Sequence, residues 1–246
     1  MYRCSVFCSF YNGEKFIKGY LEDVLKQNLF NEIEFIFLDC ASTQNEKAQI
    51  IPLTQIYPNI KYYHLDTDPG LYACWNKAVA LCSADIIGNW NIDDRKSSNS
   101  FDILLKRFEQ VPDLDLVYGI TYETTIENQK YEDNNYMITN SCEEPCLLSL
   151  LRANSPHCMP LWRKSIHERF GYFDESYYSA ADFEMWLRIC VEGARMSAIF
   201  HPIGLYYRNP TGRSTDPKTQ QKCREEVYNI IQKYSTKSLT KQKSLV

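Results

Sequence analysis

The chain has 246 residues, of which 44% are hydrophobic and 24% charged, a composition that excludes general disorder and predicts a sizeable core. Its formal net charge is −4, and the segment from Asp216 onward holds seven Lys or Arg against three acids, so that the rest carries −8. This acidic body excludes a general electrostatic binder of nucleic acid, and it would need a cation to hold phosphate groups.

Strands and helices alternate in the first part of the chain. Arg3–Phe10 has the pattern of a strand, and the apolar residues after Gly13 recur at helical spacing. Further strands are expected at Glu34–Asp39, Ile60–Leu65 and Asp85–Trp90, with helices between them at Gln44–Tyr57 and Leu71–Cys82. This alternation predicts an α/β protein with a parallel, doubly wound sheet.

The second part of the chain alternates less regularly. No element is assigned to the polar stretch Glu123–Asn140, and Arg195–Arg208 has the pattern of two short strands. In the tail, apolar residues at helical spacing predict a helix that docks on the body, with a polar end beyond Ser235. The other expected elements are a helix at Phe101–Phe108, a strand at Leu114–Thr121, a helix near Pro145–Arg152, an apolar stretch at His157–Trp162 and a helix at Ala181–Glu192.

The cellular setting can be predicted from the start of the chain and from its cysteines. The first residues form an expected strand and do not have the pattern of a signal peptide, so the ten cysteines are expected to be reduced thiols in the cytoplasm. No apolar run approaches the roughly 20 residues that cross a bilayer. Two interpretations of the basic tail remain open, namely contact with an anionic membrane surface and a solvated face of a docked helix.

Phosphate binding by a glycine-rich loop is not expected. The chain has nine glycines and neither of the common glycine-rich phosphate motifs, which leaves carboxylates and a divalent metal ion as the route to phosphate binding. Open parallel sheets bind ligands at the carboxyl ends of their strands. Four successive expected strands deliver aromatic or acidic residues to that edge, namely Tyr11, Asp39, Asp68, and the pair Asp93 and Asp94.

Five ordered blocks resemble the family 2 glycosyltransferases over roughly residues 1–214. The resemblance implies the GT-A fold, an αβα sandwich with a mixed, mostly parallel central sheet, and transfer of a sugar from a nucleotide diphosphate to a hydroxyl with inversion. It implies one domain at 1–215, with a nucleotide-sugar-binding half at 1–98 and an acceptor-binding half at 99–215, followed by a helix and polar tail at 216–246. The blocks are Ser5–Asn12, Leu38–Thr43, Asp68–Lys77, Ala84–Asp94, and Gly171–Glu175 with Ala181–Arg188.

The resemblance also assigns roles to single positions. Asp182 matches the catalytic base of the family, and Asn91 stands where the family has the first acid of its D-x-D element. Because an amide supplies no charge, binding of Mn²⁺ or Mg²⁺ would fall to Asp93 and Asp94. His157 and Trp186 match the acceptor side. The donor-binding positions are Ser9, Tyr11, Asp39, Asp68, Asn91, Asp93, Arg208 and Arg213.

Several of these residues have a competing structural interpretation. Asp39 has the position of a helix cap, and Asp68 precedes a Pro-Gly turn signal. Asp93 and Asp94 also fit a solvated turn after a buried strand. Ser179 and Asp182 have the spacing of a capping box, in which the acid bonds a backbone N–H at the start of a helix.

The expected function is metal-dependent transfer from a UDP- or dTDP-linked sugar to a glycan, a lipid-linked saccharide or a protein. Two other functions combine an α/β sheet with a nucleotide. A sugar-phosphate nucleotidyltransferase is disfavoured because it typically has a glycine-rich basic loop after its first strand, and Ser9–Glu14 is no such loop. A catalytically inactive nucleotide-sugar-binding module is suggested by Asn91.

Overall fold

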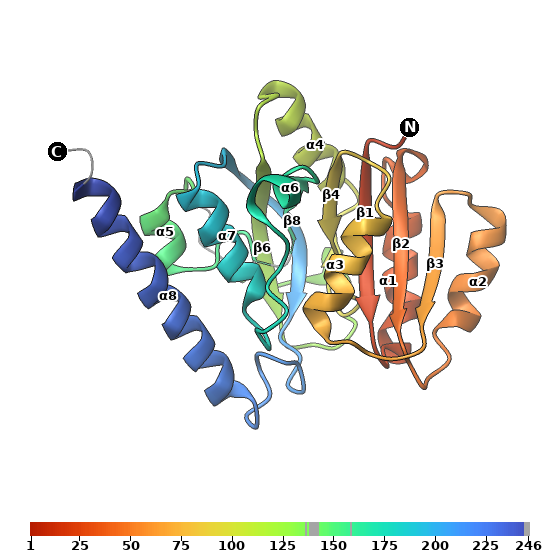
Figure 1. Cartoon of the computed structure of the whole chain (residues 1–246). Coiled ribbons are helices and arrows are strands. Elements are labelled where there is room, and N and C mark those ends of the chain that lie inside the picture. Colours follow the sequence, from red (N-terminus) through yellow and green to blue (C-terminus); the bar gives the residue numbers. More distant parts are fainter. Residues whose placement is uncertain (136, 138–142, 158, 244–246) are drawn as a thin grey trace.

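The computed structural model of the protein describes residues 1–135, 137, 143–157 and 159–243, with side chains up to residue 236. Eight strands form one sheet in the order β3-β2-β1-β4-β7-β6-β8-β5 (Figure 1). The strands are β1 (Cys4–Phe10), β2 (Ile33–Cys40), β3 (Ile60–Leu65), β4 (Ile86–Asn89), β5 (Arg95–Lys96), β6 (Leu116–Thr124), β7 (Leu161–Arg163) and β8 (Met196–Tyr207).

The sheet is mixed and mostly parallel, as predicted. β1 lies between β2 and β4 and is parallel to both, and β3 continues the parallel part beyond β2. β7 is antiparallel to both of its neighbours, β4 and β6, whereas β6 and β8 are parallel. In Figure 1 the arrowheads of β1, β2, β3 and β8 all lie at the lower edge of the sheet. The strand ends that carry the expected donor-binding residues therefore share one edge.

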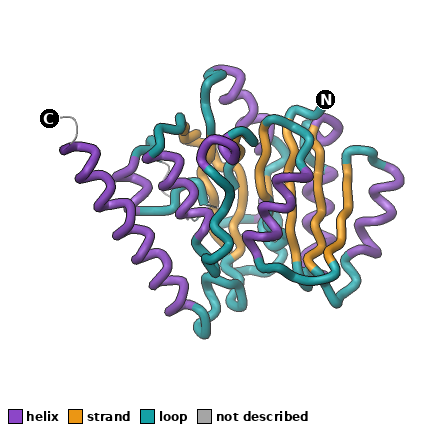
Figure 2. The backbone as a smooth tube through the Cα atoms, viewed as in Figure 1, coloured by secondary structure: helices purple, strands orange, loops and turns teal. Residues whose placement is uncertain are grey.

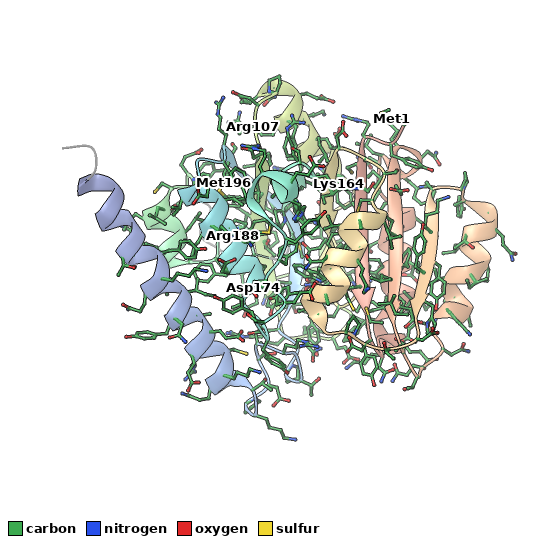
Figure 3. The ribbon with its side chains drawn as sticks, in the orientation of Figure 1. Met1, Arg107, Lys164, Asp174, Arg188 and Met196 are labelled. Atoms are coloured by element: carbon green, nitrogen blue, oxygen red, sulfur yellow. The ribbon has the colours of Figure 1, made fainter. Side chains whose placement is uncertain are left out.

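Helices cover both faces of the sheet (Figure 2), and their side chains, drawn in Figure 3, pack against it. One buried cluster joins the sheet to α1, α2 and α4, and a second joins the other face to α3, α6 and α7. A third cluster packs α5, α7 and α8 together. The helices are α1 (Glu14–Leu25), α2 (Lys47–Ile56), α3 (Leu71–Leu81), α4 (Ser100–Gln110), α5 (Leu147–Arg152), α6 (Ile166–Phe170), α7 (Ala181–Val191) and α8 (Gln220–Lys243), with short 3₁₀ turns at Phe30–Glu32 and Tyr131–Asp133.

One expectation about the second part of the chain was wrong. Residues 195–208 do not form two strands, because β8 is a single strand that pairs with β6 on both sides of a register shift near Gly119 and Ile120. Helix α8 continues through the polar end of the chain as far as Lys243. No element was predicted for the stretch Glu123–Asn140. It contains the end of β6 and the 3₁₀ turn Tyr131–Asp133, and its residues 136 and 138–140 lie outside the described part of the chain.

The C-terminal helix docks on the body as its apolar spacing predicts. Cys223, Ile230 and Tyr234 on α8 are buried, the last two against α5 and α7. None of the helices in the described part of the chain is both long and apolar enough to span a membrane. The eight cysteines that the structure describes are all free thiols, seven of them buried or half-buried.

Candidate active site

A cavity of about 270 Å³ lies at the carboxyl edge of the sheet, and we call it the strand-edge cavity. Ser9 and Tyr11 reach it from the end of β1, and Asn91 and Asp93 reach it from the segment after β4. The other walls come from the start of α3, the start of α7 and the segment after β8. They include Tyr72, Trp75, Ser179, Asp182, Asn209 and the run from Gly212 to Thr215.

A second cavity of about 590 Å³ lies between α5, α7 and α8, and we call it the helical groove. Its walls are partly apolar, with Phe183 at the start of α7 and Val227 and Tyr228 on α8. His157, Ser179, Asp182 and Ser214 line both cavities. Asp182 is the one acid among these four, and it therefore stands where the two cavities meet.

Both carboxylate oxygens of Asp182 accept a hydrogen bond. The phenol of Tyr72 donates to Oδ1 at 3.2 Å, and the amide of Asn154 donates to Oδ2 at 2.9 Å. Burial raises the pKa of Asp182, and the hydrogen bonds from Asn154, the backbone of Phe183 and Tyr72 oppose that rise. A carboxylate that is fixed in orientation and has a raised pKa is suited to accept a proton near neutral pH.

The capping-box interpretation of Asp182 was wrong. The residue before α7 is Ala180, and no side chain caps this helix. The backbone amide of Ser179 donates instead to Glu226 on α8, at 2.9 Å. Asp182 therefore does not reach back to the amide of Ser179, and its carboxylate contacts Tyr72 and Asn154 instead.

The two adjacent acids after β4 have different surroundings. Asp93 lines the strand-edge cavity, where the amide of Asn209 donates to it at 3.3 Å, and burial raises its pKa. Asp94 is fully buried and does not line the cavity. Its oxygens accept hydrogen bonds from the backbone of Tyr207 at 3.0 Å and from Asn91 at 3.1 Å. Of the pair, Asp93 is the one placed to hold a ligand, and Asp94 ties the segment to β8.

The part of the chain that the structure describes contains no cluster of three or more His, Cys, Asp or Glu side chains arranged as a metal site. A protein cage for a metal ion is therefore absent from these residues. Mg²⁺ and Mn²⁺ are often held by one or two carboxylates together with substrate phosphates. Asp93, which faces the strand-edge cavity, fits this kind of site.

Asp39 lies at the end of β2 but does not line the strand-edge cavity. It is buried, and Tyr62 donates to it at 2.7 Å, the backbone of Ser42 at 2.8 Å, and His64 Nδ1 lies 3.2 Å away. Burial would raise the pKa of Asp39, but these hydrogen bonds outweigh it and lower the pKa. Asp39 on β2 is paired with Phe10 on β1, and Phe10 directly precedes Tyr11 in the chain. Asp39 therefore supports the strand end that carries Tyr11.

Asp68 and Arg208 also lie outside the walls of the strand-edge cavity. Asp68 is exposed and accepts a hydrogen bond from the backbone of Gly70 at 2.8 Å, which is the turn role that its sequence context indicates. Arg208 pairs with Glu123 at 3.0 Å. Arg213 does line the cavity, and its guanidinium lies 4.9 Å from the ring centre of Tyr178.

The loop after β1 is held against the loop after β2. Asn12 has a positive φ of 54°, and its side-chain oxygen accepts hydrogen bonds from the backbone of Thr43 at 2.8 Å and from its hydroxyl at 3.1 Å. The backbone of Asn12 donates to Ser42 at 3.0 Å. This arrangement fixes the neighbouring Tyr11, a residue that is 54% exposed and can stack on a ligand.

The two residues expected on the acceptor side have different positions. His157 lines both cavities, its ring contacts Tyr206 with centres 4.6 Å apart, and burial lowers its pKa to about 4, so that it is neutral at pH 7. Trp186 is fully buried in the core, with its ring centre 5.3 Å from that of Trp162. The expectation of an acceptor contact for Trp186 was wrong, because this face of α7 packs on the sheet.

Three polar residues of the site were not predicted. Tyr72 falls in a block that the resemblance uses, but its contact with Asp182 joins positions 110 residues apart. Asn154 and Asn209 stand in segments without a recognisable motif. The pattern of a single sequence indicates which residues share a face of one helix or strand. It does not indicate which residues from distant segments come into contact.

Comparisons with known proteins identify the family of the chain. The model of the family described as "Glycosyl transferase family 2" matches residues 5–170, about two thirds of the chain. The chain is 25% identical over 191 residues to chondroitin synthase of Escherichia coli, covering 77% of this chain and 26% of that protein. It is 24% identical over 199 residues to the putative colanic acid biosynthesis glycosyl transferase WcaA of E. coli K12, covering 76% of this chain and 66% of WcaA.

Solved structures with GT-A-like folds resemble the protein over most of its length. The Staphylococcus aureus TarS fragment 1–349 in complex with UDP-GlcNAc has a TM-score of 0.74 and 19% identity, covering 94% of this chain and 65% of that one. The mannosyltransferase PcManGT of Pyrobaculum calidifontis, solved with GDP-Man and Mn²⁺, has a TM-score of 0.64 and 14% identity, covering 85% and 58%. These likenesses concern the fold.

Proposed function

Because the chain belongs to glycosyl transferase family 2 and is a glycosyltransferase, we propose that it moves one sugar from a nucleoside diphosphate to an acceptor hydroxyl, with inversion at the anomeric carbon. UDP or dTDP is the proposed carrier. The observation that carries this proposal is the position of Asp182, which lines both the strand-edge cavity and the helical groove. One carboxylate can then face a donor on one side and an acceptor on the other.

The strand-edge cavity is the proposed donor site. Its exposed Tyr11 ring offers a surface on which the nucleobase can stack, and Arg213 offers a guanidinium for a phosphate oxygen. Asp93 would hold Mg²⁺ or Mn²⁺ together with the diphosphate, and the bound ion would neutralise charge on the leaving group. The UDP-GlcNAc complex of TarS, which shares this fold, supports a nucleotide sugar as the ligand.

The helical groove is the proposed acceptor site. Its apolar wall of Phe183, Val227 and Tyr228 suits the faces of sugar rings or an aglycone, and Asn154 and Gln220 provide polar contacts. The acceptor is proposed to be a glycan, a lipid-linked saccharide or a protein, within the biosynthesis of a polysaccharide or related glycan. The similarity to chondroitin synthase and to the colanic acid glycosyl transferase WcaA supports a glycan acceptor. Contact of the basic tail with a membrane belongs only to the lipid-linked case.

The proposed reaction is a single displacement. The acceptor oxygen attacks the anomeric carbon from the face opposite the diphosphate, and its proton passes to Asp182. The new C–O bond forms as the bond between the anomeric carbon and the phosphate oxygen breaks, and the electron pair leaves with the nucleoside diphosphate. General base catalysis of this kind typically contributes ~10² to 10⁴ in rate.

Release of nucleoside diphosphate tests the proposal. The full chain is incubated with Mn²⁺ and, separately, with UDP- and dTDP-linked sugars, with and without saccharide acceptors. We expect one sugar nucleotide to stabilise the protein against heat and to release its diphosphate, and nuclear magnetic resonance of the product to show the opposite anomer. If a nucleotide sugar binds but is neither transferred nor slowly hydrolysed, the result would favour an inactive binding module instead.

A further inference from the structure

The first turns of α8 contact the segment that leads into Asp182. The carboxylate of Glu226 accepts a hydrogen bond from the backbone amide of Tyr178 at 2.5 Å, and another from that of Ser179 at 2.9 Å. The hydroxyl of Ser179 lies 3.4 Å from the same carboxylate. Tyr178 and Ser179 lie four and three positions before Asp182. This contact therefore fixes the backbone segment that leads to the proposed base.

The first turn of α8 and Thr219, the residue before it, also contact the donor side. The hydroxyl of Thr219 and the thiol of Cys223 both donate to the backbone carbonyl of Arg213, at 2.7 and 3.3 Å. The guanidinium of Arg213, which lines the strand-edge cavity, donates to the carbonyl of Tyr178 at 3.4 Å. The start of α8 thus holds a donor-side residue and the base-bearing segment in one fixed arrangement.

Glu226 contacts the two residues just before the N-cap of α7, a helix that has no side-chain cap. No side chain of its own caps the start of α7, although the amides there point outward and form the positive end of the helix dipole. A carboxylate supplied from another helix satisfies neighbouring amides and places negative charge near that end. Loss of this carboxylate would free the segment 177–181 to shift, and with it Asp182.

Docking of α8 rests on a different set of contacts. Glu184 on α7 is buried and accepts hydrogen bonds from Tyr234 and from Lys233, the latter at 2.9 Å. Arg188, labelled on α7 in Figure 3, donates to the other oxygen of Glu184 at 3.1 Å. Because these contacts lie two turns further along α8, the helix should remain docked when Glu226 is changed.

We propose that Glu226 is a positioning residue for sugar transfer, which sets the carboxylate of Asp182 between donor and acceptor through the segment 178–181. This inference rests on the proposed function. Displacement of a catalytic group by about 1 Å can cost ~10²-fold in rate. The effect should fall on turnover rather than on donor affinity, since Glu226 lines neither cavity.

The test compares Glu226→Ala and Glu226→Gln with Glu225→Gln. Glu225 is the adjacent exposed residue and accepts a hydrogen bond from Gln221 at 2.7 Å within α8, so it is a matched control. We expect E226A to lower kcat by about 10- to 100-fold and E226Q by less, while the Kd for the donor nucleotide with Mn²⁺ changes by less than about threefold. Hydrogen exchange of the 177–183 amides should quicken in E226A and stay unchanged in E225Q.

The outcomes separate the two claims. If the wild type transfers sugar and E226A keeps the kcat and amide exchange of E225Q, the inference is wrong and the proposed function stands. A loss of activity that only follows a lowered unfolding temperature, with kcat per folded molecule unchanged, also overturns the inference. If the wild type neither transfers sugar nor hydrolyses a donor, the proposed function fails, and the contact of Glu226 is structural.

Discussion

The phenol of Tyr72 donates a hydrogen bond to Oδ1 of Asp182 at 3.2 Å, while Asn154 donates to Oδ2 at 2.9 Å. Tyr72 comes from α3 and Asn154 from the segment after α5, so elements from both halves of the chain orient this carboxylate. Burial raises the pKa of Asp182, and both hydrogen bonds stabilise its ionised form. The pair Tyr72–Asp182 therefore sets both the direction and the basicity of the proposed base.

Replacement of Tyr72 by Phe should move the acid limb of the kcat profile to higher pH. The hydrogen bond from Tyr72 lowers the pKa of Asp182, so its loss adds to the rise caused by burial. A hydrogen bond to a charged group contributes about 1.5–3 kcal/mol and one pKa unit is about 1.4 kcal/mol, so a shift of about one to two pH units is expected. The measurement is kcat against pH for both proteins.

A matched control for this variant is Tyr63→Phe. Tyr63 lies on β3, is 38% exposed and lines neither cavity. Its profile should coincide with that of the wild type. An unchanged acid limb in Y72F would mean that Asp182 does not control the ionisation on which turnover depends.

Exchange of Asp93 for Asn should weaken the binding of UDP or dTDP in the presence of Mn²⁺, by about tenfold or more. Asp93 is the acid of its pair that faces the strand-edge cavity, and an amide is a poorer ligand for a hard cation. Calorimetric titrations with and without Mn²⁺ measure this effect. Wild-type affinity and wild-type dependence on Mn²⁺ in D93N would remove Asp93 from the metal site.

The neighbouring change Asp94→Asn should act on stability instead. Asp94 accepts hydrogen bonds from Tyr207 and Asn91 in a fully buried position, and an amide there leaves one donor without an acceptor. The expected loss is about 1–3 kcal/mol in the free energy of unfolding. Thermal or urea unfolding measures it, and nucleotide affinity per folded molecule should change less than in D93N.

Glu184→Gln should loosen α8 in a manner that depends on pH. Burial would raise the pKa of Glu184, but hydrogen bonds from Tyr234 and Lys233 and the charge of Arg188 outweigh it and lower the pKa. The stabilisation is therefore present above the unfolded pKa of about 4.3 and lost as the pH falls through the lower folded value. At pH 7 the variant should lose about 1.5–3 kcal/mol.

The matched comparison for Glu184→Gln is Lys233→Gln. Lys233 is 42% exposed, so its removal should cost only about 0–1 kcal/mol. Urea unfolding at pH 7 and at pH 4 measures both variants. An E184Q deficit that grows as the pH falls would contradict the assigned direction of the pKa shift.

The first half of the fold could be predicted because its elements are local patterns. The apolar runs of β1 and β2 and the helical spacing of α1 are readable within about a dozen residues, and the strand ends then share an edge by topology. The continuity of β8 could not be predicted. Phe200 and His201 are exposed, and the segment around them has the sequence pattern of a turn. The strand is continuous because β8 pairs with β6 on both sides of the register shift.

The site was predictable where a motif carried it and not where distant contacts build it. Asp93 and Asp182 lie in recognisable blocks, and the structure places both in one cavity. Trp186 belongs to the same block as Asp182 but faces the core, because the block does not say which side of α7 meets the sheet. The contact of Glu226 with the start of α7 spans 47–48 residues between two helices, which no local pattern reports.

The most direct test of the account is Asp182→Asn, measured for donor binding and for transfer in the same preparation. An amide keeps the shape of the side chain but cannot accept the acceptor's proton. We expect the Kd for UDP or dTDP with Mn²⁺ to stay within about threefold of the wild type while transfer falls by ~10² to 10⁴. Transfer at the wild-type rate, or equal loss of binding and transfer, would contradict the role of Asp182 as the base.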